Sequence, residues 1–287
     1  MSIHKKINKS ISWSITKNCN YNCDYCISAD RKFRKDKYPE PYSFLRGFKK
    51  YLKGSWIFYI CGSGEPFLTP RFLDIIKELV KNNHKLVIIT NFSASVETLI
   101  HFSKIAGNNL IHLAASFHPD FKKDEVFLKK AIIINKILGN KRFSVRVVVK
   151  KRKLIYLTNL GKKLKKNNIS FFLKPMRIND ENTYTQKTID YNKKEWDLIK
   201  RFPLHNDENL SNINCYKGKK CWAGSMYFII DEKGDAWRCY PAQKMRLSKD
   251  YLGNLINENF KLRNKATECL YQNCYCIQPI VNKMIEE

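Results

Sequence analysis

The fold is decided by Cys19-Asn20-Tyr21-Asn22-Cys23-Asp24-Tyr25-Cys26, in which three cysteines follow the spacing CxxxCxxC. This stretch follows Trp13-Ser14-Ile15-Thr16, an alternating run that predicts a short strand ending in a loop. Three thiolates on so short a loop can hold one face of a cubane iron–sulfur cluster and leave the fourth iron without a protein ligand. Such an iron keeps an open position for a substrate or cofactor, as a catalytic zinc does.

Two plainer interpretations of this loop stay open on the residues alone. A zinc site normally shows paired CxxC motifs and a fourth ligand nearby, and this loop holds neither. Three cysteines can also meet by chance in an apolar core, but Asn18, Asn20, Asn22 and Asp24 make this loop polar. A polar loop with three thiols favours a metal cluster.

The CxxxCxxC spacing, with the aromatic Tyr25 before its last cysteine, resembles the signature of the radical S-adenosylmethionine (radical SAM) enzymes. The resemblance implies that Cys19, Cys23 and Cys26 bind a 4Fe–4S cluster whose open iron binds SAM, with Tyr25 beside the cofactor. It implies that one electron, from a donor such as flavodoxin or ferredoxin, cleaves SAM to methionine and a 5′-deoxyadenosyl radical. That radical abstracts a hydrogen atom from a substrate.

A second motif, Cys61-Gly62-Ser63-Gly64-Glu65-Pro66, follows the apolar run of residues 56–61. Glycines let the backbone approach a ligand closely, and a glutamate can accept a hydrogen bond from a charged amine. The segment resembles the GGEP motif of the same family, with a serine in place of the first glycine. The resemblance implies contacts to the amino group of the methionine half of SAM from Gly62, Ser63, Gly64 and Glu65. An ordinary glycine turn is the plainer alternative.

Three polar residues on later strands are further candidates for SAM contacts. Asn91 closes the third predicted strand and Ser116 closes the fourth. Arg146 lies inside the fifth, where an arginine is costly unless it meets an anion or a carboxylate. A plain structural role is equally compatible with each of these positions.

Apolar runs of strand length alternate with stretches of helical periodicity over residues 12–174. The expected strands are residues 12–16, 56–61, 85–91, 110–117, 143–150 and 169–174. The expected helices are residues 42–52, 70–82, 95–106, 124–138 and 154–166. Strands that alternate with helices predict an α/β fold with a parallel sheet. The radical SAM resemblance implies a partial TIM barrel of six units, open on one side.

The sequence predicts three parts. Residues 11–178 form the barrel. Residues 179–210 hold a polar segment without periodicity, which predicts a linker or an active-site flap, and a short helix over 192–201. Residues 211–287 form a small C-terminal domain with helix and a β-hairpin at 226–237, whose turn contains Gly234.

The C-terminal part holds a second group of cysteines at Cys215, Cys221, Cys239, Cys269, Cys274 and Cys276. Their opening spacing resembles the SPASM domain, and the short series that follows is similar to the twitch domain, which carries one auxiliary 4Fe–4S cluster. The resemblance implies one such cluster on Cys215, Cys221 and Cys239, with a fourth ligand from the tail. Cys276 and Cys274 are preferred there to Cys269. Two auxiliary clusters, or a structural zinc ion, are the alternatives.

The 287 residues carry a net charge of +27, from 53 Lys and Arg against 26 Asp and Glu. This charge is compatible with an anionic partner, so a basic RNA-binding or RNA-modifying iron–sulfur protein is the distant alternative. The lysines are scattered over predicted helices without an RNA-binding signature, which does not favour nucleic acid. No apolar run reaches the roughly 20 residues of a membrane span. Cysteines in metal-like spacings indicate a reducing cytoplasm.

The family resemblance leads us to expect hydrogen abstraction from an unactivated C–H bond, with oxidation or cross-linking of a small molecule. No separate domain precedes the first predicted strand, which shifts the expectation away from recognition of a leader peptide. The alternative is a maturase that modifies a ribosomal peptide or protein.

Overall fold

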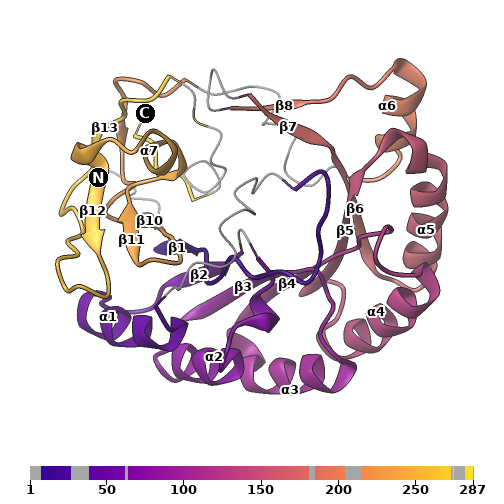
Figure 1. Cartoon of the computed structure of the whole chain (residues 1–287), viewed down its shortest axis with the longest axis horizontal. Helices are drawn as coiled ribbons and strands as arrows, with labels where there is room; N and C mark the ends of the chain where they lie inside the picture. The colour runs from indigo at the N-terminus through magenta and orange to yellow at the C-terminus, as the bar shows by residue number, and fades with distance from the viewer. Residues whose placement is uncertain are drawn as a thin grey trace, which may run out of the picture.

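A computed structural model of the chain describes residues 8–26, 39–61, 64–180, 185–203, 215–272, 274 and 282–286. Its first six strands form a parallel sheet in sequence order. They are β1 (Ser10–Trp13), β2 (Ile57–Ile60), β3 (Lys85–Thr90), β4 (Leu110–Ser116), β5 (Phe143–Val149) and β6 (Ser170–Pro175). Figure 1 shows this sheet curved into an open arc. The predicted α/β fold with an open, six-unit partial barrel is confirmed.

Five helices connect these strands and cover the outer side of the arc (Figure 1). They are α1 (Phe44–Tyr51), α2 (Phe72–Lys81), α3 (Val96–Ala106), α4 (Asp124–Leu138) and α5 (Leu154–Lys166). The strand residues that face them are apolar and buried; Trp13 of β1, for example, packs against Phe44 and Phe48 of α1 with ring centroids 5.2 and 5.0 Å apart. Among the described helices, none combines the length and the apolar character that a membrane crossing requires.

The inner face of the sheet is partly polar. Successive side chains of a strand point to opposite faces, so Val145 and Val147 of β5 join the core while Arg146 and Val148 are half-buried on the other side. Ser116 of β4 is the register partner of Arg146. The sheet is therefore apolar toward the helices and offers polar groups on its concave face.

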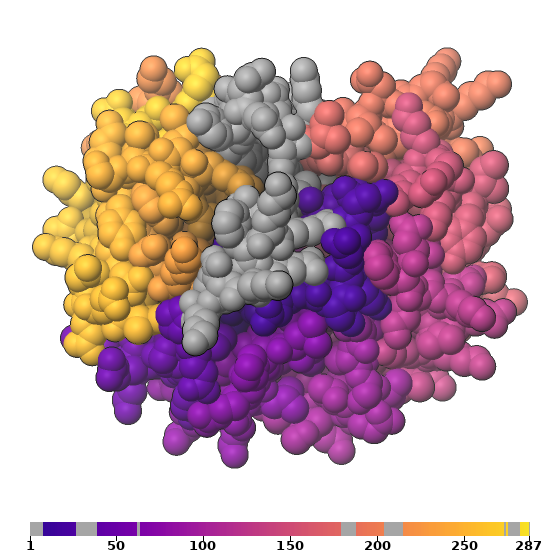
Figure 2. Space-filling view, in the orientation of Figure 1, coloured from indigo at the N-terminus to yellow at the C-terminus, as the bar shows by residue number. Residues whose placement is uncertain are grey.

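The C-terminal segment continues the same sheet. β10 (Tyr227–Ile230) pairs in parallel with β1 on the side opposite β2, and β11 (Asp235–Trp237) and β12 (Tyr251–Asn254) follow antiparallel. The predicted hairpin is present, with Gly234 at a positive φ of 90° in its turn. Phe228 of β10 joins the core of the barrel. In the space-filling view the gold C-terminal residues lie directly against the indigo and purple N-terminal part (Figure 2). The three-part division at residues 178 and 211 stays a prediction, and the sheet crosses it.

The segment expected to be a linker or flap contains an antiparallel hairpin, β7 (Arg177–Asp180) with β8 (Thr185–Thr188). Its strands lack apolar alternation in the sequence, and Ile178 is 52% exposed. The predicted short helix is α6 (Lys193–Ile199), which begins with a capping box of Asn192 and Glu195. The remaining elements are β9 (Lys220–Cys221), β13 (Thr267–Glu268), α7 (Tyr240–Met245) and 3₁₀ turns at Pro41–Ser43, Pro66–Leu68, Gly107–Asn109, Lys151–Lys153 and Ser248–Asp250.

At Gly47, helix α1 lies very close to Leu255 of the C-terminal segment. A Cβ at this position would lie 2.5 Å from the Cγ atom and 2.7 Å from the carbonyl oxygen of Leu255. In a free helix alanine is better than glycine by about 1 kcal/mol, but overpacking a core costs about 1–3 kcal/mol. We expect Gly47→Ala to lower the free energy of unfolding by roughly 1–2 kcal/mol in urea denaturation.

The matched control is Lys49→Ala on the exposed side of the same helix. It should leave the free energy of unfolding within about 0.5 kcal/mol of the wild type. A Gly47→Ala protein more stable than the wild type would contradict the packing of α1 on Leu255.

Candidate active site

The cysteine loop follows β1 and folds onto the concave face of the sheet. Tyr21, Cys23 and Tyr25 are buried there as one packed group, and Cys19 and Cys26 lie against it. Val148 of β5 and Met176, which follows β6, complete the group. The structure thus brings the three cysteines of the motif together, beside the ends of strands that lie far along the chain.

Nitrogen groups surround the sulfurs of this loop. The backbone N–H of Tyr21 donates to Cys19 Sγ at 3.5 Å, and the Asn91 side-chain amide lies 3.7 Å from the same sulfur. His118 Nδ1 lies 3.2 Å from Cys23 Sγ and 2.8 Å from the Tyr25 hydroxyl. Burial lowers the pKa of His118 to about 4, so the imidazole is neutral at pH 7. Hydrogen-bond donors next to sulfur favour the thiolate form that ligates metals.

The second motif packs against Asn18, the residue directly before Cys19. The backbone N–H of Glu65 donates to Asn18 O at 2.7 Å. A Cβ on Gly64 would lie 2.3 Å from the same oxygen, so only glycine permits this contact. Gly62 and Ser63 of the motif lie outside the described residues.

Glu65 itself is 1% exposed and ties the end of β2 to the end of β3. Its carboxylate accepts hydrogen bonds from Thr90 Oγ1 at 2.6 Å and from the backbone N–H groups of Asn91 at 2.5 Å and Phe67 at 3.2 Å. Burial raises the pKa of Glu65, and these hydrogen bonds oppose the rise. The carboxylate holds Asn91 next to the cysteine loop, where its side-chain amide also donates to Asn20 Oδ1 at 2.8 Å.

Two of the remaining candidates are neighbours on the concave face. Ser116 and Arg146 are register partners, and the Phe117 N–H donates to Arg146 O at 2.8 Å. Val148, two residues after Arg146 and therefore on the same face of β5, contacts the cysteine loop. Ser116 of β4 and Arg146 of β5 are thus on the face that carries the loop, and Asn91, directly after β3, contacts the loop.

An ion-pair cluster anchors the loop to the same strand ends. Lys150 Nζ, at the end of β5, lies 2.8 Å from a carboxylate oxygen of Asp24 in the loop and 2.8 Å from one of Asp120 after β4. Lys153 also pairs with Asp120. Hydrogen bonds from Lys150 and then Lys153 hold the pKa of Asp120 at about 2, well below its usual range. Sequence analysis missed His118, Lys150 and Asp120, although His118 comes two residues after Ser116 at the end of a predicted strand.

A second group of cysteines meets in the C-terminal segment. Cys221, Cys239, Cys269 and Cys274 are buried and line one small cavity together with Arg238 and Tyr271. Cys215 is exposed and is not among the residues that line it, and Cys276 lies outside the described residues. Cys61 is separate from both groups, and its thiol donates to Tyr59 O at 3.7 Å.

All nine cysteines in the part of the chain that the structure describes are free thiols. No three His, Cys, Asp or Glu side chains of that part are close enough together, as they stand, to hold a metal ion.

Comparison with known proteins matches residues 13–147 to the family model of the Radical SAM superfamily. Native anSMEcpe with bound AdoMet is similar in structure, with a TM-score of 0.55, 16% identity and coverage of 87% of this chain and 79% of that one. The same protein with AdoMet and the Cp18Cys peptide has a TM-score of 0.54 and 15% identity, over 88% of this chain and 79% of that one. SuiB of Streptococcus suis has a TM-score of 0.56 and 16% identity, over 88% of this chain and 64% of that one. At these identities the likeness concerns the fold. No curated protein matches this sequence.

Replacing Lys150 tests the anchoring of the loop. Lys150→Met leaves Asp24 and Asp120 without their shared cation, which has a side chain only 10% exposed. Hydrogen bonds to charged groups contribute about 1.5–3 kcal/mol, and the exposure of Asp24 reduces this value. We expect the free energy of unfolding to fall by roughly 1–2 kcal/mol in urea denaturation.

Lys151→Met is the matched control, because Lys151 is exposed and lies 3.8 Å from Glu195. Exposed pairs contribute about 0–1 kcal/mol, so this variant should stay close to the wild type. Equal losses in the two variants would show that Lys150 does not anchor the loop.

Proposed function

We propose that the chain is a radical SAM enzyme that abstracts a hydrogen atom from its substrate, because residues 13–147 match the family model of the Radical SAM superfamily. The group it would use is a 4Fe–4S cluster on Cys19, Cys23 and Cys26, which supplies the electron that cleaves SAM to a 5′-deoxyadenosyl radical. The observation that carries the proposal is the packing of these three cysteines into one group under the Gly64–Glu65 segment.

The chemistry of the donors suits such a cluster. Three thiols stand on one loop, N–H donors lie next to Cys19 Sγ, His118 Nδ1 lies next to Cys23 Sγ, and no fourth cysteine occurs in the loop. Three cysteines that leave one iron open suit a cluster that binds a cofactor. A one-electron donor such as a flavodoxin or ferredoxin would reduce it, and a reducing cytoplasm suits the free thiols.

The surrounding residues would bind and orient SAM. We assign the amino group of the cofactor to Gly62, Ser63, Gly64 and Glu65, as the resemblance implies. The Glu65 carboxylate is held at this place by hydrogen bonds from Thr90 and Asn91. Arg146 and Ser116 would meet the carboxylate or ribose, because a guanidinium and a hydroxyl both donate to oxygen. Asn91 and Tyr25 would border the cofactor from the loop side.

The C-terminal cavity would hold one auxiliary 4Fe–4S cluster, as the twitch resemblance implies. Four buried thiols around one space are the complete donor set of a cubane cluster. They are Cys221, Cys239, Cys269 and Cys274, so Cys269 takes the place that sequence analysis gave to Cys215. The same donors suit a structural zinc ion, and iron content together with the visible absorption spectrum separates the two metals.

The substrate class has two candidates. Sequence analysis favours oxidation or cross-linking of a small molecule. Modification of a peptide is favoured by one observation, since a structure with the same fold, that of anSMEcpe, holds the Cp18Cys peptide together with AdoMet. We propose the peptide as the first class to test and the small molecule as the second.

The catalytic assignment is tested by Cys19→Ala, Cys23→Ala and Cys26→Ala in one chain. Under dithionite the wild type should convert SAM to 5′-deoxyadenosine, and the triple variant should make none, because no thiolate is left to hold the first cluster. Chromatography with mass detection measures the product. A triple variant that still forms 5′-deoxyadenosine at the wild-type rate refutes the assignment.

The auxiliary ligands are tested by comparing Cys269→Ala with Cys215→Ala. Loss of one of four ligands should release the auxiliary cluster, so Cys269→Ala should keep about half of the bound iron. Cys215→Ala should keep nearly all of it. The reverse result would restore Cys215 as a ligand and remove Cys269.

A further inference from the structure

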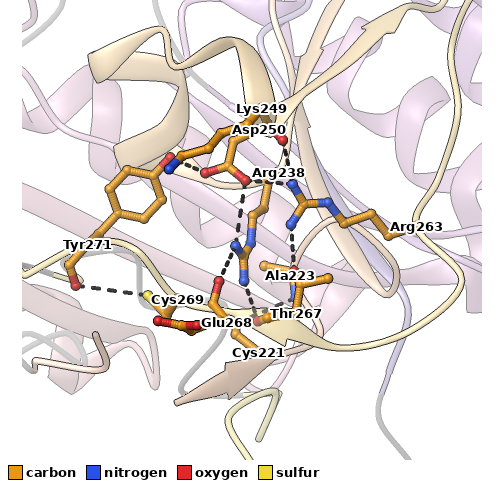
Figure 3. Close-up of polar contacts among 10 residues, drawn as sticks. All are labelled: Cys221, Ala223, Arg238, Lys249, Asp250, Arg263, Thr267, Glu268, Cys269 and Tyr271. Atoms are coloured by element: carbon orange, nitrogen blue, oxygen red, sulfur yellow. Dashed lines mark hydrogen bonds and ion pairs between the residues drawn. The ribbon is translucent and has the colours of Figure 1, made fainter. Parts of the chain in front are cut away.

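A network of buried charges borders the C-terminal cysteine cavity. Arg238, between β11 and α7, is 1% exposed, and its guanidinium donates to the backbone oxygens of Glu268 at 2.7 Å and Thr267 at 2.8 Å. It also pairs with Asp250 at 3.5 Å. Figure 3 shows the guanidinium directed at β13, with Cys221 and Cys269 beside it. These three contacts fix the side chain in one place, because a planar guanidinium presents several donors in a rigid fork.

Asp250 stands between two arginines. Its carboxylate accepts from Arg263 Nη2 at 2.6 Å, and Tyr271 donates its hydroxyl to the second oxygen. Asp250 is fully buried and the Arg263 side chain is 20% exposed. Burial and the hydrogen bond to Asp250 raise the pKa of Tyr271, so the phenol stays neutral. Among the described residues, Asp250 is the single carboxylate that pairs with either arginine.

The charges of this triad do not cancel. Two guanidinium groups against one carboxylate leave one positive charge, and Arg238 carries it to the wall of the cavity. An unbalanced buried charge is costly, so a native protein supplies an opposite charge nearby. The cavity offers four thiols, and thiolates that ligate a metal cluster are the available anions.

Arg238 and Cys221 line the same cavity, and the backbone N–H of Ala223 donates to Cys221 Sγ at 3.4 Å. Hydrogen bonds and positive charge next to cluster sulfurs favour the more negative, reduced form of an iron–sulfur cluster. Any role of this kind rests on the auxiliary cluster proposed above.

We propose that Arg238, held by Asp250 and Arg263, is a positioning residue that raises the reduction potential of the auxiliary cluster at Cys221, Cys239, Cys269 and Cys274. The fixed charge favours uptake of one electron, delivered by a one-electron reductant. Arg263 adds to the positive electrostatic potential at the cluster from farther away, and the negative charge of Asp250 lowers that potential. We therefore expect the reduction potential to fall when an arginine is removed and to rise when the aspartate is removed.

The test measures the midpoint potential of the auxiliary cluster. The chain carries Ala at Cys19, Cys23 and Cys26, so that the auxiliary cluster is the single cluster present. Electron paramagnetic resonance follows a titration with dithionite. Arg238→Gln should lower the ratio of reduced to oxidised cluster about tenfold at a fixed ambient potential, which is about 59 mV for one electron. Asp250→Asn should raise that ratio, because it removes the opposing charge. Arg238→Lys, which keeps the charge, should stay closer to the wild type than Arg238→Gln.

Arg246→Gln is the control, since it removes an exposed arginine of the same segment and should not move the potential. If Arg238→Gln does not retain the cluster, Arg263→Gln decides the question, because it removes the same charge from a partly exposed position and should also lower the potential. Potentials that do not move, or that move in the same direction in the arginine and aspartate variants, overturn this role and leave the auxiliary cluster in place. A triple variant without iron overturns the auxiliary cluster, and this role with it.

Discussion

The parallel pairing of β1 with both β2 and β10 is the constraint on which the rest of the structure depends. β1 is a strand of four residues, Ser10–Trp13, yet it holds ladders on both edges and its side chains pack into the core. Because parallel strands place their carboxyl ends at one edge of the sheet, the cysteine loop, the Gly64–Glu65 segment and the Asp231–Asp235 turn emerge next to one another. Lys17, just before the loop, pairs with Glu232 in that turn at 2.7 Å.

This arrangement gives the two cysteine groups one rigid scaffold. The first group follows β1 directly, and Cys239 follows β11, two strands away in the same sheet. Buried polar groups fix each group in place: Glu65 and Lys150 at the first, and Arg238 with Asp250 at the second. Such groups are costly to bury and are retained when each has its partners. The electrostatic potential at both cysteine groups is thus set by buried side chains that the fold holds in place.

Sequence patterns predicted the elements better than they predicted the contacts. Helices at 124–138 and 154–166 match α4 and α5 residue for residue, because apolar residues recur in both with helical periodicity. The hairpin β7–β8 was not foreseen, since residues 177–188 show no apolar alternation in the sequence. The spacing of Cys19, Cys23 and Cys26 predicts a common site, and the structure packs them in one group; their role as ligands stays a prediction. Lys150 and Arg238 could not be found from the sequence, because their partners lie 126 and 30 residues away along the chain and each looks like one more basic residue in a basic sequence.

The cysteines of the C-terminal segment also show that contacts between distant residues are not readable from spacing. Spacing puts Cys215 near Cys221 along the chain, but the fold places Cys269 beside Cys221 through the pairing of β13 with β9. Thr267 is the register partner of Cys221 in that short ladder. A two-residue pairing of this kind leaves no periodic signal in the sequence.

Mössbauer spectroscopy of the protein loaded with ⁵⁷Fe tests the central claim, a radical SAM site with an open iron beside a fully ligated auxiliary cluster. The account predicts two 4Fe–4S clusters, about eight irons per chain, and a change in the signal of one iron when SAM is added. Iron signals that SAM leaves unchanged would contradict the open site, and a chain that holds one cluster would contradict the pair.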